Sequence, residues 1–456
     1  MKKVAILLSL LIIFACEDDK DATPSVDIDE TPPKLSIISP ISDFTYSDTV
    51  NIIAETSDES GILKVNFYID DDSVHSDSLI PYNYLWNTRN YLNGSHEIKV
   101  VSYDTELNFL QDSILINIQN TIRYKKYYAY NNPRMIIEDK YSNYYLLGSN
   151  FTNSNYHGVL IKIDSLGSVI WNQIYGEAFS NDNTRFESFK YIENEGFIII
   201  GAKQVNDNYD LLLIKTDLNG KIIWEKTIGG NLEDWGNSLV IHNDGFFILG
   251  RKTKDNVSYN WDSDIWLVKI DMDGDIVWEK TYESGLDLTE WATSLYLIDN
   301  GVLAIFGNNN SQTFMIKTDL EGNELSIREI DEINSISVEH TNSGNFIITG
   351  QGRQSQEQIP VIMVDKDGNE IWKKLIEGDT GYSIKQTNDN GFILSGTTVD
   401  GKFYTLLSKL NDEGDEIWSR VTDDIVNYYA LQTMDGGYIV MFTYGVFKTD
   451  SDGFFE

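Results

Sequence analysis

The chain has a single cysteine, Cys16, among its 456 residues. One cysteine excludes an intramolecular disulfide and any metal site built from several cysteines. Basic residues are also few, because 35 lysines and arginines stand against 71 acidic residues, for a formal net charge of −36. This excess of negative charge makes nucleic acid an unfavourable partner. A cationic ligand, a divalent metal and a neutral glycan all stay compatible with it, and so does a purely solubilising role.

Histidines and catalytic motifs are scarce as well. The chain contains no HExxH and no GxSxG segment, and its five histidines include no two at metal-ligand spacing. These absences favour a protein that is not an enzyme. Paired carboxylates for glycoside cleavage remain open, because they can come from segments far apart in the sequence.

The only long apolar run is Val4–Phe14, which follows Lys2 and Lys3. It is too short to span a bilayer and is typical of a signal peptide, predicted over residues 1–15. The sequence IFAC that ends at Cys16 resembles the lipobox of bacterial lipoproteins, which implies lipidation of the Cys16 thiol and attachment to the outer membrane. The alternative is an ordinary signal peptide with a chance cysteine.

Residues 16–32 are predicted to form an acidic tether. Glu17–Thr31 holds seven acidic residues and one lysine, a composition that does not collapse into a core. An acidic cluster directly after the lipidated cysteine resembles the surface-export signal of some Gram-negative lipoproteins, which implies exposure at the cell surface. The alternative is a solvated spacer that leaves the protein facing the periplasm.

The chain from residue 121 onward is organised around a repeated segment, best seen as KTDLNGKIIWEKTIGG at Lys215–Gly230. A repeat of about 40 to 55 residues indicates a repeat architecture. Each unit holds two hairpins with Asn/Asp-Gly turns, which predict two-residue turns with positive φ at both central residues. The turn glycines of the second hairpins are Gly167, Gly220, Gly274, Gly322, Gly368, Gly414 and Gly453.

Several of the predicted strands are apolar on both faces, such as Phe197–Ile200 and Leu211–Ile214. A strand of this kind must be covered on both sides, which a four-stranded antiparallel blade between two neighbouring blades achieves. The repeats therefore predict a seven-bladed β-propeller over residues 121–456, with six or eight blades left open. A tryptophan four residues after most turn glycines indicates packing between blades rather than a ligand platform.

The last repeat stops three residues after Gly453 and lacks its fourth strand. Ile122–Tyr128 aligns with Ile222–Ile228, which places Tyr124 at the tryptophan position. We therefore expect this N-terminal strand of the propeller to complete the last blade and close the ring.

Residues 33–120 are predicted to form a separate β-sandwich with strands at Leu35–Ser39, Val50–Thr56, Leu63–Ile69, Tyr82–Trp86, His96–Ser102 and Ile114–Ile118. The segments GILKVNFYIDDD and NGSHEIKVVSYD resemble bacterial immunoglobulin-like domains. The propeller repeat resembles the tryptophan-docking repeat of quinoprotein-like propellers and a repeat of secreted bacterial lipoproteins. These resemblances imply an all-β chain, an Ig-like β-sandwich followed by a propeller, and leave the function open.

Candidate ligand residues lie in the loops after the second and fourth strands of the blades, which share one rim of the ring. Exposed aromatic side chains next to Asn and Asp are typical of sites that bind sugars or peptides. The residues predicted to bind a ligand are Tyr156, Tyr209, Tyr259, Trp261, Trp235 and Trp291. Some of these aromatic residues also have an alternative interpretation, in which they begin the inner strand of the next blade and simply pack there. This alternative applies to Trp235, Trp291, Tyr382 and Tyr428.

Three turns invite a calcium interpretation: Asp271–Asp275, Asp365–Gly368 and Asp450–Gly453. A calcium loop of the EF-hand type needs D-x-D-x-D-G and a distal glutamate, whereas here the glycine directly follows the second aspartate. We therefore interpret these segments as hairpin turns, and no metal or cofactor is predicted.

The sequence favours a surface-anchored lipoprotein that acts as a binding module. The tether and the Ig-like domain would hold a propeller that binds a glycan or an envelope protein. Two alternatives remain: an extracytoplasmic enzyme, quinone-dependent or carbohydrate-active, and a structural scaffold of the envelope. Two absences argue against a quinone-dependent enzyme: the chain has no vicinal cysteines, and its sequence shows no cationic funnel for an anionic cofactor.

Overall fold

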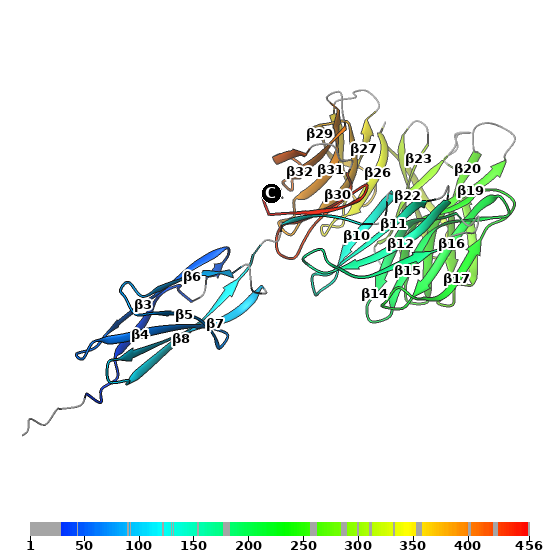
Figure 1. Cartoon of the computed structure of the whole chain (residues 1–456). Helices are drawn as coiled ribbons and strands as arrows, with labels where there is room; N and C mark the ends of the chain where they lie inside the picture. Colours follow the sequence, from blue (N-terminus) through cyan, green and yellow to red (C-terminus); the bar gives the residue numbers. More distant parts are fainter. Residues whose placement is uncertain are drawn as a thin grey trace, which may run out of the picture. The chain divides into compact units, whose positions relative to one another are not determined.

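The computed structural model describes residues 29–454 apart from 43, 89, 90, 92, 121, 122, 129, 131, 153, 154, 177–182, 256–261, 284–289, 299, 300, 310, 311, 332, 353–357, 400–402 and 423–426. Its regular elements are β-strands (Figure 1). In this described part, no helix has the length and apolar character needed to cross a bilayer. The chain divides into two compact units, Met1–Asn120 and Thr121–Glu456.

The first unit is an Ig-like sandwich of two sheets, as predicted. One sheet has the order β1 (Lys34–Ser39), β3 (Thr49–Ser57), β6 (Asn83–Asn87). The other has the order β2 (Thr45–Tyr46), β8 (Phe109–Ile118), β7 (Gly94–Asp104), β4 (Ile62–Ile69), β5 (Asp72–Asp77). Alternate residues of the strands point into a core that includes the fully buried Trp86 and Phe67.

Two short strands of this unit escaped the sequence analysis. β5 has the polar sequence DSVHSD and lies at the edge of its sheet, where it pairs with β4 alone. β2 has two residues and pairs in parallel with the end of β8. Edge strands need no apolar face, and so neither segment carries the alternation that marks a buried strand.

The second unit consists, among the described residues, of seven four-stranded antiparallel blades. The first is β10 (Asn132–Glu138), β11 (Tyr144–Thr152), β12 (Asn155–Ile163), β13 (Val169–Tyr175); the second is β14 (Thr184–Ile192), β15 (Gly196–Val205), β16 (Asn208–Thr216), β17 (Ile222–Ile228). The third is β18 (Asp234–His242), β19 (Gly245–Asp255), β20 (Asp262–Ile270), β21 (Ile276–Tyr282); the fourth is β22 (Trp291–Ile298), β23 (Val302–Asn308), β24 (Thr313–Asp319), β25 (Glu324–Asp331).

The remaining blades complete the set. The fifth is β26 (Ile333–His340), β27 (Phe346–Gly352), β28 (Gln358–Val364), β29 (Glu370–Glu377); the sixth is β30 (Thr380–Gln386), β31 (Phe392–Val399), β32 (Phe403–Leu410), β33 (Glu416–Thr422). The seventh is β34 (Asn427–Gln432), β35 (Tyr438–Phe442), β36 (Gly445–Thr449) and β9 (Tyr124–Tyr127). A single residue pair, Gln351 with Thr380, joins the fifth and sixth blades into one larger sheet.

The ring closes as the sequence predicts. β9 pairs with β36 at the outer edge of the last blade, so the red C-terminal strands lie beside the start of the propeller (Figure 1). Tyr124 pairs with Lys448, the same register in which Trp224 pairs with Lys215. Each inner strand contacts the next, from β10 through to β34, and β34 contacts β10. These contacts make a closed β-propeller.

The strands that are apolar on both faces lie between two cores. Phe197 and Ile199 of β15 pack in the cluster shared with the first blade, whereas Ile198 and Ile200 pack in the cluster shared with the third. All four side chains are fully buried. The neighbouring blades therefore cover β15 on both sides, as the apolar pattern of this strand requires.

The repeated tryptophan packs against the turn glycine of the next blade. A Cβ atom added to Gly274 would lie 3.0 Å from Cη2 of Trp224, and the equivalent atom on Gly414 would lie 2.6 Å from Trp372. Where Ser326 replaces the tryptophan, the side chains of Arg328 and Met315 lie against Gly368. The repeated aromatic residue is therefore a contact between blades, as the sequence analysis favoured.

The turns of the second hairpins differ from the predicted two-residue type. Gly220 has a φ of 75°, whereas Asn219 is not among the residues with positive φ. The Gly220 N–H donates to the Asp217 carbonyl (3.0 Å), and the Asp217 N–H donates to the Lys221 carbonyl (2.9 Å). This is a three-residue loop, a type I turn followed by a bulged glycine. The Asp217 carboxylate fixes the turn by accepting the N–H groups of Asn219 and Lys221, each at 2.9 Å.

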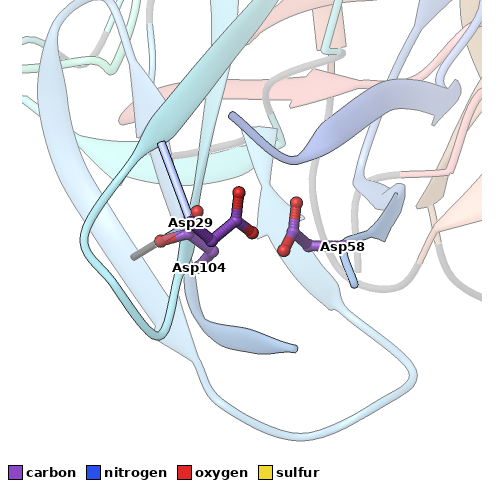
Figure 2. Close-up of side chains that lie close together, drawn as sticks. All are labelled: Asp29, Asp58 and Asp104. Carbon is purple, nitrogen blue, oxygen red and sulfur yellow. The ribbon is translucent and has the colours of Figure 1, made fainter. Parts of the chain in front are cut away.

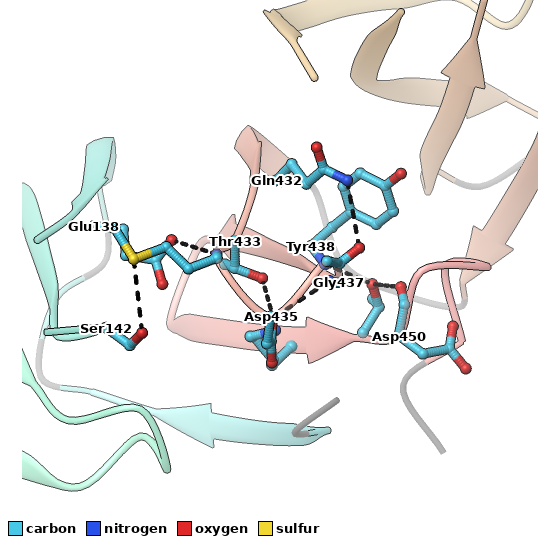
Figure 3. Close-up of polar contacts among 12 residues, drawn as sticks. Glu138, Ser142, Gln432, Thr433, Asp435, Gly437, Tyr438 and Asp450 are labelled. Carbon is cyan, nitrogen blue, oxygen red and sulfur yellow. Dashed lines mark hydrogen bonds and ion pairs between the residues drawn. The ribbon is translucent and has the colours of Figure 1, made fainter. Parts of the chain in front are cut away.

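The joint between the last and first blades is drawn in Figure 3. The Oε2 atom of Glu138, at the end of β10, accepts the Met434 N–H at 2.9 Å from the β34–β35 turn. Behind this contact, the fully buried Lys448 donates to both carboxylate oxygens of Asp435, at 2.6 and 2.9 Å. The closing joint therefore contains ionisable groups as well as apolar packing.

Candidate binding site

Each of the seven described inner strands carries a β-bulge at the same position. A bulge adds one residue to a strand and turns its side chain out of the regular alternation. Here the extra residues line a cavity of about 400 Å³ at the centre of the ring, called the central channel below. They are Arg134, Glu187, Asn237, Thr293, Ile336, Tyr382 and Tyr428.

Three of the predicted aromatic residues meet at one end of the blades, around an arginine. Cζ of Arg185 lies 3.9 Å from the ring centroid of Tyr156, 5.4 Å from that of Tyr209 and 5.7 Å from that of Trp235. The rings of Tyr209 and Trp235 are 5.0 Å apart and inclined by 34°. We call Tyr156, Arg185, Tyr209 and Trp235 the rim cluster. Stacking on aromatic faces stabilises the guanidinium and fixes its position.

The local folding explains why these residues meet. Tyr209 follows a two-residue turn, Asn206-Asp207, in which both residues have positive φ (49° and 72°). Tyr156 occupies the matching place in the first blade and is held by its N–H, which donates to Oδ1 of Asn183 at 2.8 Å. Arg185 and Trp235 are the second residues of β14 and β18. All four side chains therefore start from the same end of adjacent blades.

The rim cluster and the neighbouring Glu233 contain buried polar atoms without a hydrogen-bond partner in the described part of the chain. They are Nε of Arg185, Oε2 of Glu233 and Nε1 of Trp235. Arg251 also stacks on Trp235, with its Cζ 5.2 Å from the ring centroid. Burial lowers the pKa of Arg251, and the carboxylates of Glu233 and Glu187 oppose this change. Unsatisfied polar atoms in native proteins are uncommon and mark places where a ligand or water completes the bonding.

The other predicted ligand residues have different fates. Trp291 begins β22 and is 51% exposed. Tyr259 and Trp261 lie outside the described residues, and so does Cys16, the predicted lipidation site. Tyr382 and Tyr428 line the central channel at bulged positions, with ring centroids 5.6 Å apart. The sequence analysis gave packing as the alternative for these last two, and it did not foresee the bulge that turns them inward.

The sequence analysis missed the arginines. Arg185 follows a loop rich in Asn and Asp, as the aromatic residues do, whereas Arg251 lies within β19, and the prediction considered aromatic side chains alone. The signal for Arg185 was available, because arginine beside exposed aromatic residues is a common feature of binding surfaces. No sequence pattern could show that Arg185 of the second blade lies against both Tyr156 of the first blade and Tyr209 of its own blade.

Buried carboxylates adjoin the rim cluster. Asp210 follows Tyr209 and is 8% exposed, and Asp234 precedes Trp235 and is 3% exposed. Burial raises the pKa of Asp234 to about 6, with a contribution from the negative charge of Asp210, against the hydrogen bond from the Thr253 N–H. Burial also raises the pKa of Asp210. The pair therefore retains protons at a higher pH than ordinary aspartates.

The first unit contains one acidic cluster in its described part, drawn in Figure 2. Asp29, Asp58 and Asp104 each place a carboxylate oxygen within 4.8 Å of the others, a spacing that would suit a divalent cation. Each carboxylate already accepts backbone N–H groups; Asp104, for example, accepts those of Glu106 (2.9 Å) and Asn108 (2.8 Å). These bonds offset the repulsion among the three negative charges.

The aspartates of the propeller turns bond to their own backbone in the same way as Asp104 does. In the turn ending at Gly274, Oδ1 of Asp271 accepts the N–H groups of Asp273 (3.0 Å) and Asp275 (2.9 Å). In the turn ending at Gly368, Oδ1 of Asp365 makes the same pair of bonds. These carboxylates serve the turn, in line with the hairpin interpretation.

Comparison with known protein families supports the Ig-like fold of the first unit. Residues 33–100 match the family model described as a bacterial Ig domain. A bacterial Ig domain is consistent with a location outside the cytoplasm. No curated protein matches the chain.

Solved structures match parts of this chain at low sequence identity. Fibronectin(III)-like modules of Clostridium thermocellum CbhA are 28% identical over 19% of this chain and 98% of theirs, with a TM-score of 0.17. The Dos1 propeller is 13% identical over 90% of this chain and 92% of its own, with a TM-score of 0.46. The C-terminal WD40 domain of Sif2 is 11% identical over 72% and 84%, with a TM-score of 0.45. The propeller assignment itself rests on the strand pairing described above.

Proposed function

We propose that this protein is a binding module outside the cytoplasm, and that the rim cluster of its propeller binds a glycan. The observation that carries the proposal is the meeting of Tyr156, Tyr209 and Trp235 around Arg185 on adjacent blades. The three aromatic residues are half-buried, so part of each stays accessible to a ligand. Aromatic faces beside polar groups are the usual composition of a sugar-binding surface.

The unsatisfied polar atoms support a glycan over an apolar ligand. Nε of Arg185 and Nε1 of Trp235 are donors, whereas Oε2 of Glu233 is an acceptor. A sugar hydroxyl both donates and accepts, so a single ring can satisfy groups of both kinds. A ligand without polar groups would leave all three atoms unpaired, which is unfavourable in a buried place.

The N-terminal sequence supports an anchored module. We propose that Cys16 carries the lipid that holds the protein at the outer membrane, on the cell-surface side, with the acidic tether and the Ig-like domain as spacers. Radiolabelled fatty acid should be incorporated into the wild-type protein and not into a Cys16→Ala variant. Equal incorporation into both proteins would contradict the anchor.

The glycan proposal is tested on a glycan array with the chain from Glu17 onward. Wild-type protein should bind a subset of glycans saturably, and the Tyr209→Ala/Trp235→Ala double variant should lose this binding. Tyr141→Ala is the matched control, because Tyr141 is 74% exposed in the β10–β11 turn, at the other end of the first blade. A Tyr259→Ala/Trp261→Ala variant tests the predicted loop separately. Undiminished binding by the Tyr209/Trp235 variant would contradict the site, and capture of an envelope protein instead would redirect the ligand class.

A second candidate function is supported by Asp210 and Asp234. The buried Asp234, whose raised pKa suits a proton donor, adjoins the rim cluster together with the buried Asp210, and glycoside hydrolysis uses two carboxyl groups in different roles. Under this alternative the propeller would cleave the glycan that it binds. Reducing sugar released by the wild-type protein and not by an Asp234→Asn variant would favour the enzyme. Binding without any release would favour the module.

A further inference from the structure

The central channel carries ionisable side chains in two layers. In the bulged layer, Nε and Nη2 of Arg134 lie 3.0 and 3.1 Å from the two carboxylate oxygens of Glu187. In the next layer, Nζ of Lys385 lies 2.7 Å from Oε2 of Glu339. Within each of these two ion pairs, the positive and the negative charge cancel. The remaining cation of the lining is Lys190, on β14.

Lys190 has no ion pair or hydrogen bond to any residue that the structure describes. Its side chain is exposed to the channel, so a ligand can reach it. Protein nonetheless surrounds it: desolvation lowers the pKa of Lys190, the positive charge of Lys385 adds to this effect, and Glu339 opposes it. The channel lining therefore has one surplus positive charge, inside a chain whose formal net charge is −36. An unpaired cation in a confined place is stabilised by any anion that can enter.

We propose that the central channel binds a small polyhydroxylated carboxylate of the size of a uronic acid, with Lys190 as its counter-ion. The cavity of about 400 Å³ lies in the range of small-molecule sites. A carboxylate would form an ion pair with Lys190, which has no ion-pair partner among the described residues. Its single negative charge matches the single surplus positive charge of the lining.

The hydroxyl groups of the ligand are indicated by a separate observation. Oδ1 of Asn237, in the bulged layer, is buried without a hydrogen-bond partner in the described part of the chain. A hydroxyl donor satisfies this acceptor, whereas a second carboxylate would be repelled by it. Across the channel, the rings of Tyr382 and Tyr428 provide aromatic surface for the carbon skeleton of a sugar.

This site is distinct from the rim cluster, since the two share no residue. The inference therefore does not depend on the proposed glycan function. The two proposals can also fail separately, because each has its own variants and its own ligands.

The test is calorimetric titration of the chain from Glu17 onward with sodium D-glucuronate at pH 7, and with neutral D-glucose as the matched ligand. Glucuronate should bind saturably, and glucose at least tenfold more weakly. Lys190→Gln should weaken glucuronate binding at least tenfold. Lys140→Gln is the control, because Lys140 is an exposed lysine in the β10–β11 turn. Tyr209→Ala/Trp235→Ala should bind glucuronate as the wild type does.

Lys190→Gln should fold normally, because Lys190 has no described partner to lose, and its melting temperature checks this. A second measurement needs no variant: in protein with 13C-labelled lysine, glucuronate should shift the titration of the Lys190 ε-carbon to higher pH. Glucuronate affinity that is unchanged by Lys190→Gln, equal affinity for glucose, or an unmoved Lys190 titration would each overturn the proposal.

Discussion

The replacement of Glu138 by glutamine at the closing joint should stabilise the propeller at alkaline pH. At two other joints between blades, the last residue of the inner strand is a glutamine. Its side chain accepts a backbone N–H from the first turn of the preceding blade. Oε1 of Gln386 accepts the Asn342 N–H, and Oε1 of Gln432 accepts the Asn388 N–H, both at 2.8 Å. Glu138 makes the same contact to Met434, but with a carboxylate whose other oxygen is buried and has no described hydrogen-bond partner.

The magnitude follows from the pKa of Glu138. Burial raises this pKa from 4.5 to about 7, against the Met434 N–H and the positive charge of Lys448. Between these two pKa values the folded state holds a proton that the unfolded state has released, so stability decreases as the pH rises from about 4.5 to 7. At about 1.4 kcal/mol per pH unit, the upper limit is about 3 kcal/mol, and partial exposure of the side chain reduces it to about 1–2 kcal/mol.

Glu138→Gln keeps the acceptor for Met434 and removes the charge. We expect the variant to be more stable than the wild type by about 1–2 kcal/mol at pH 8, and the difference to shrink at pH 5. The assay is urea unfolding followed by tryptophan fluorescence. Every tryptophan except Trp86 belongs to residues 121–456, so the fluorescence reports on the propeller.

The reciprocal variant is the control. Gln432→Glu places a carboxylate at the equivalent joint and should destabilise the propeller at pH 8 more than at pH 5. The reasoning is refuted if Glu138→Gln lowers stability at pH 8, or if wild type and variant show the same dependence of unfolding free energy on pH.

Four further predictions concern packing, the turns and the rim. Trp224→Ala should destabilise the propeller by about 2–4 kcal/mol in urea unfolding, because a half-buried indole leaves a gap under the next turn, whereas Ile223→Ala, at a side chain 57% exposed, should change stability by under about 1 kcal/mol. Gly274→Ala should cost at least about 1 kcal/mol, because φ is 82° and the new Cβ would lie 3.0 Å from Trp224; a melting temperature equal to that of the wild type would contradict the contact. Asp234→Asn should stabilise the protein at pH 8 relative to pH 5, because the raised pKa of Asp234 makes its ionised form unfavourable in the folded state; the pH dependence of thermal unfolding decides this. Deletion of the N-terminal residues through β9 (Tyr124–Tyr127) should leave β36 with a free edge and produce aggregation in light scattering, and a monomeric, equally stable product would contradict closure by this strand.

Several features of the candidate sites were beyond the reach of the sequence. The aromatic residues at positions 156, 209 and 235 were identified, since each follows a loop on the same rim of a repeat. Their arrangement around Arg185 was not, because it depends on how adjacent blades stack. For Tyr382, the sequence offered packing in the next blade as the alternative to ligand binding. Its place in the channel lining follows from the bulge in β30, which the sequence did not reveal. The cluster of Asp29, Asp58 and Asp104 joins segments that no spacing rule connects.

The sequence by itself determined the architecture: repeated turns defined the blades, strands apolar on both faces required neighbours on both sides, and the alignment of Tyr124 with Trp224 identified the closing strand. These properties are local or periodic, and so they can be read along the chain. Only the tertiary structure decided which side chains meet. Tyr156 on Arg185, the charged groups that act on Lys190 and the partner of Glu138 come from other blades. The turn at Gly220 adopted a bulged form in which the Asp217 side chain bonds to the backbone. Contacts between blades depend on the angle and register of stacking, which packing sets and no single repeat encodes.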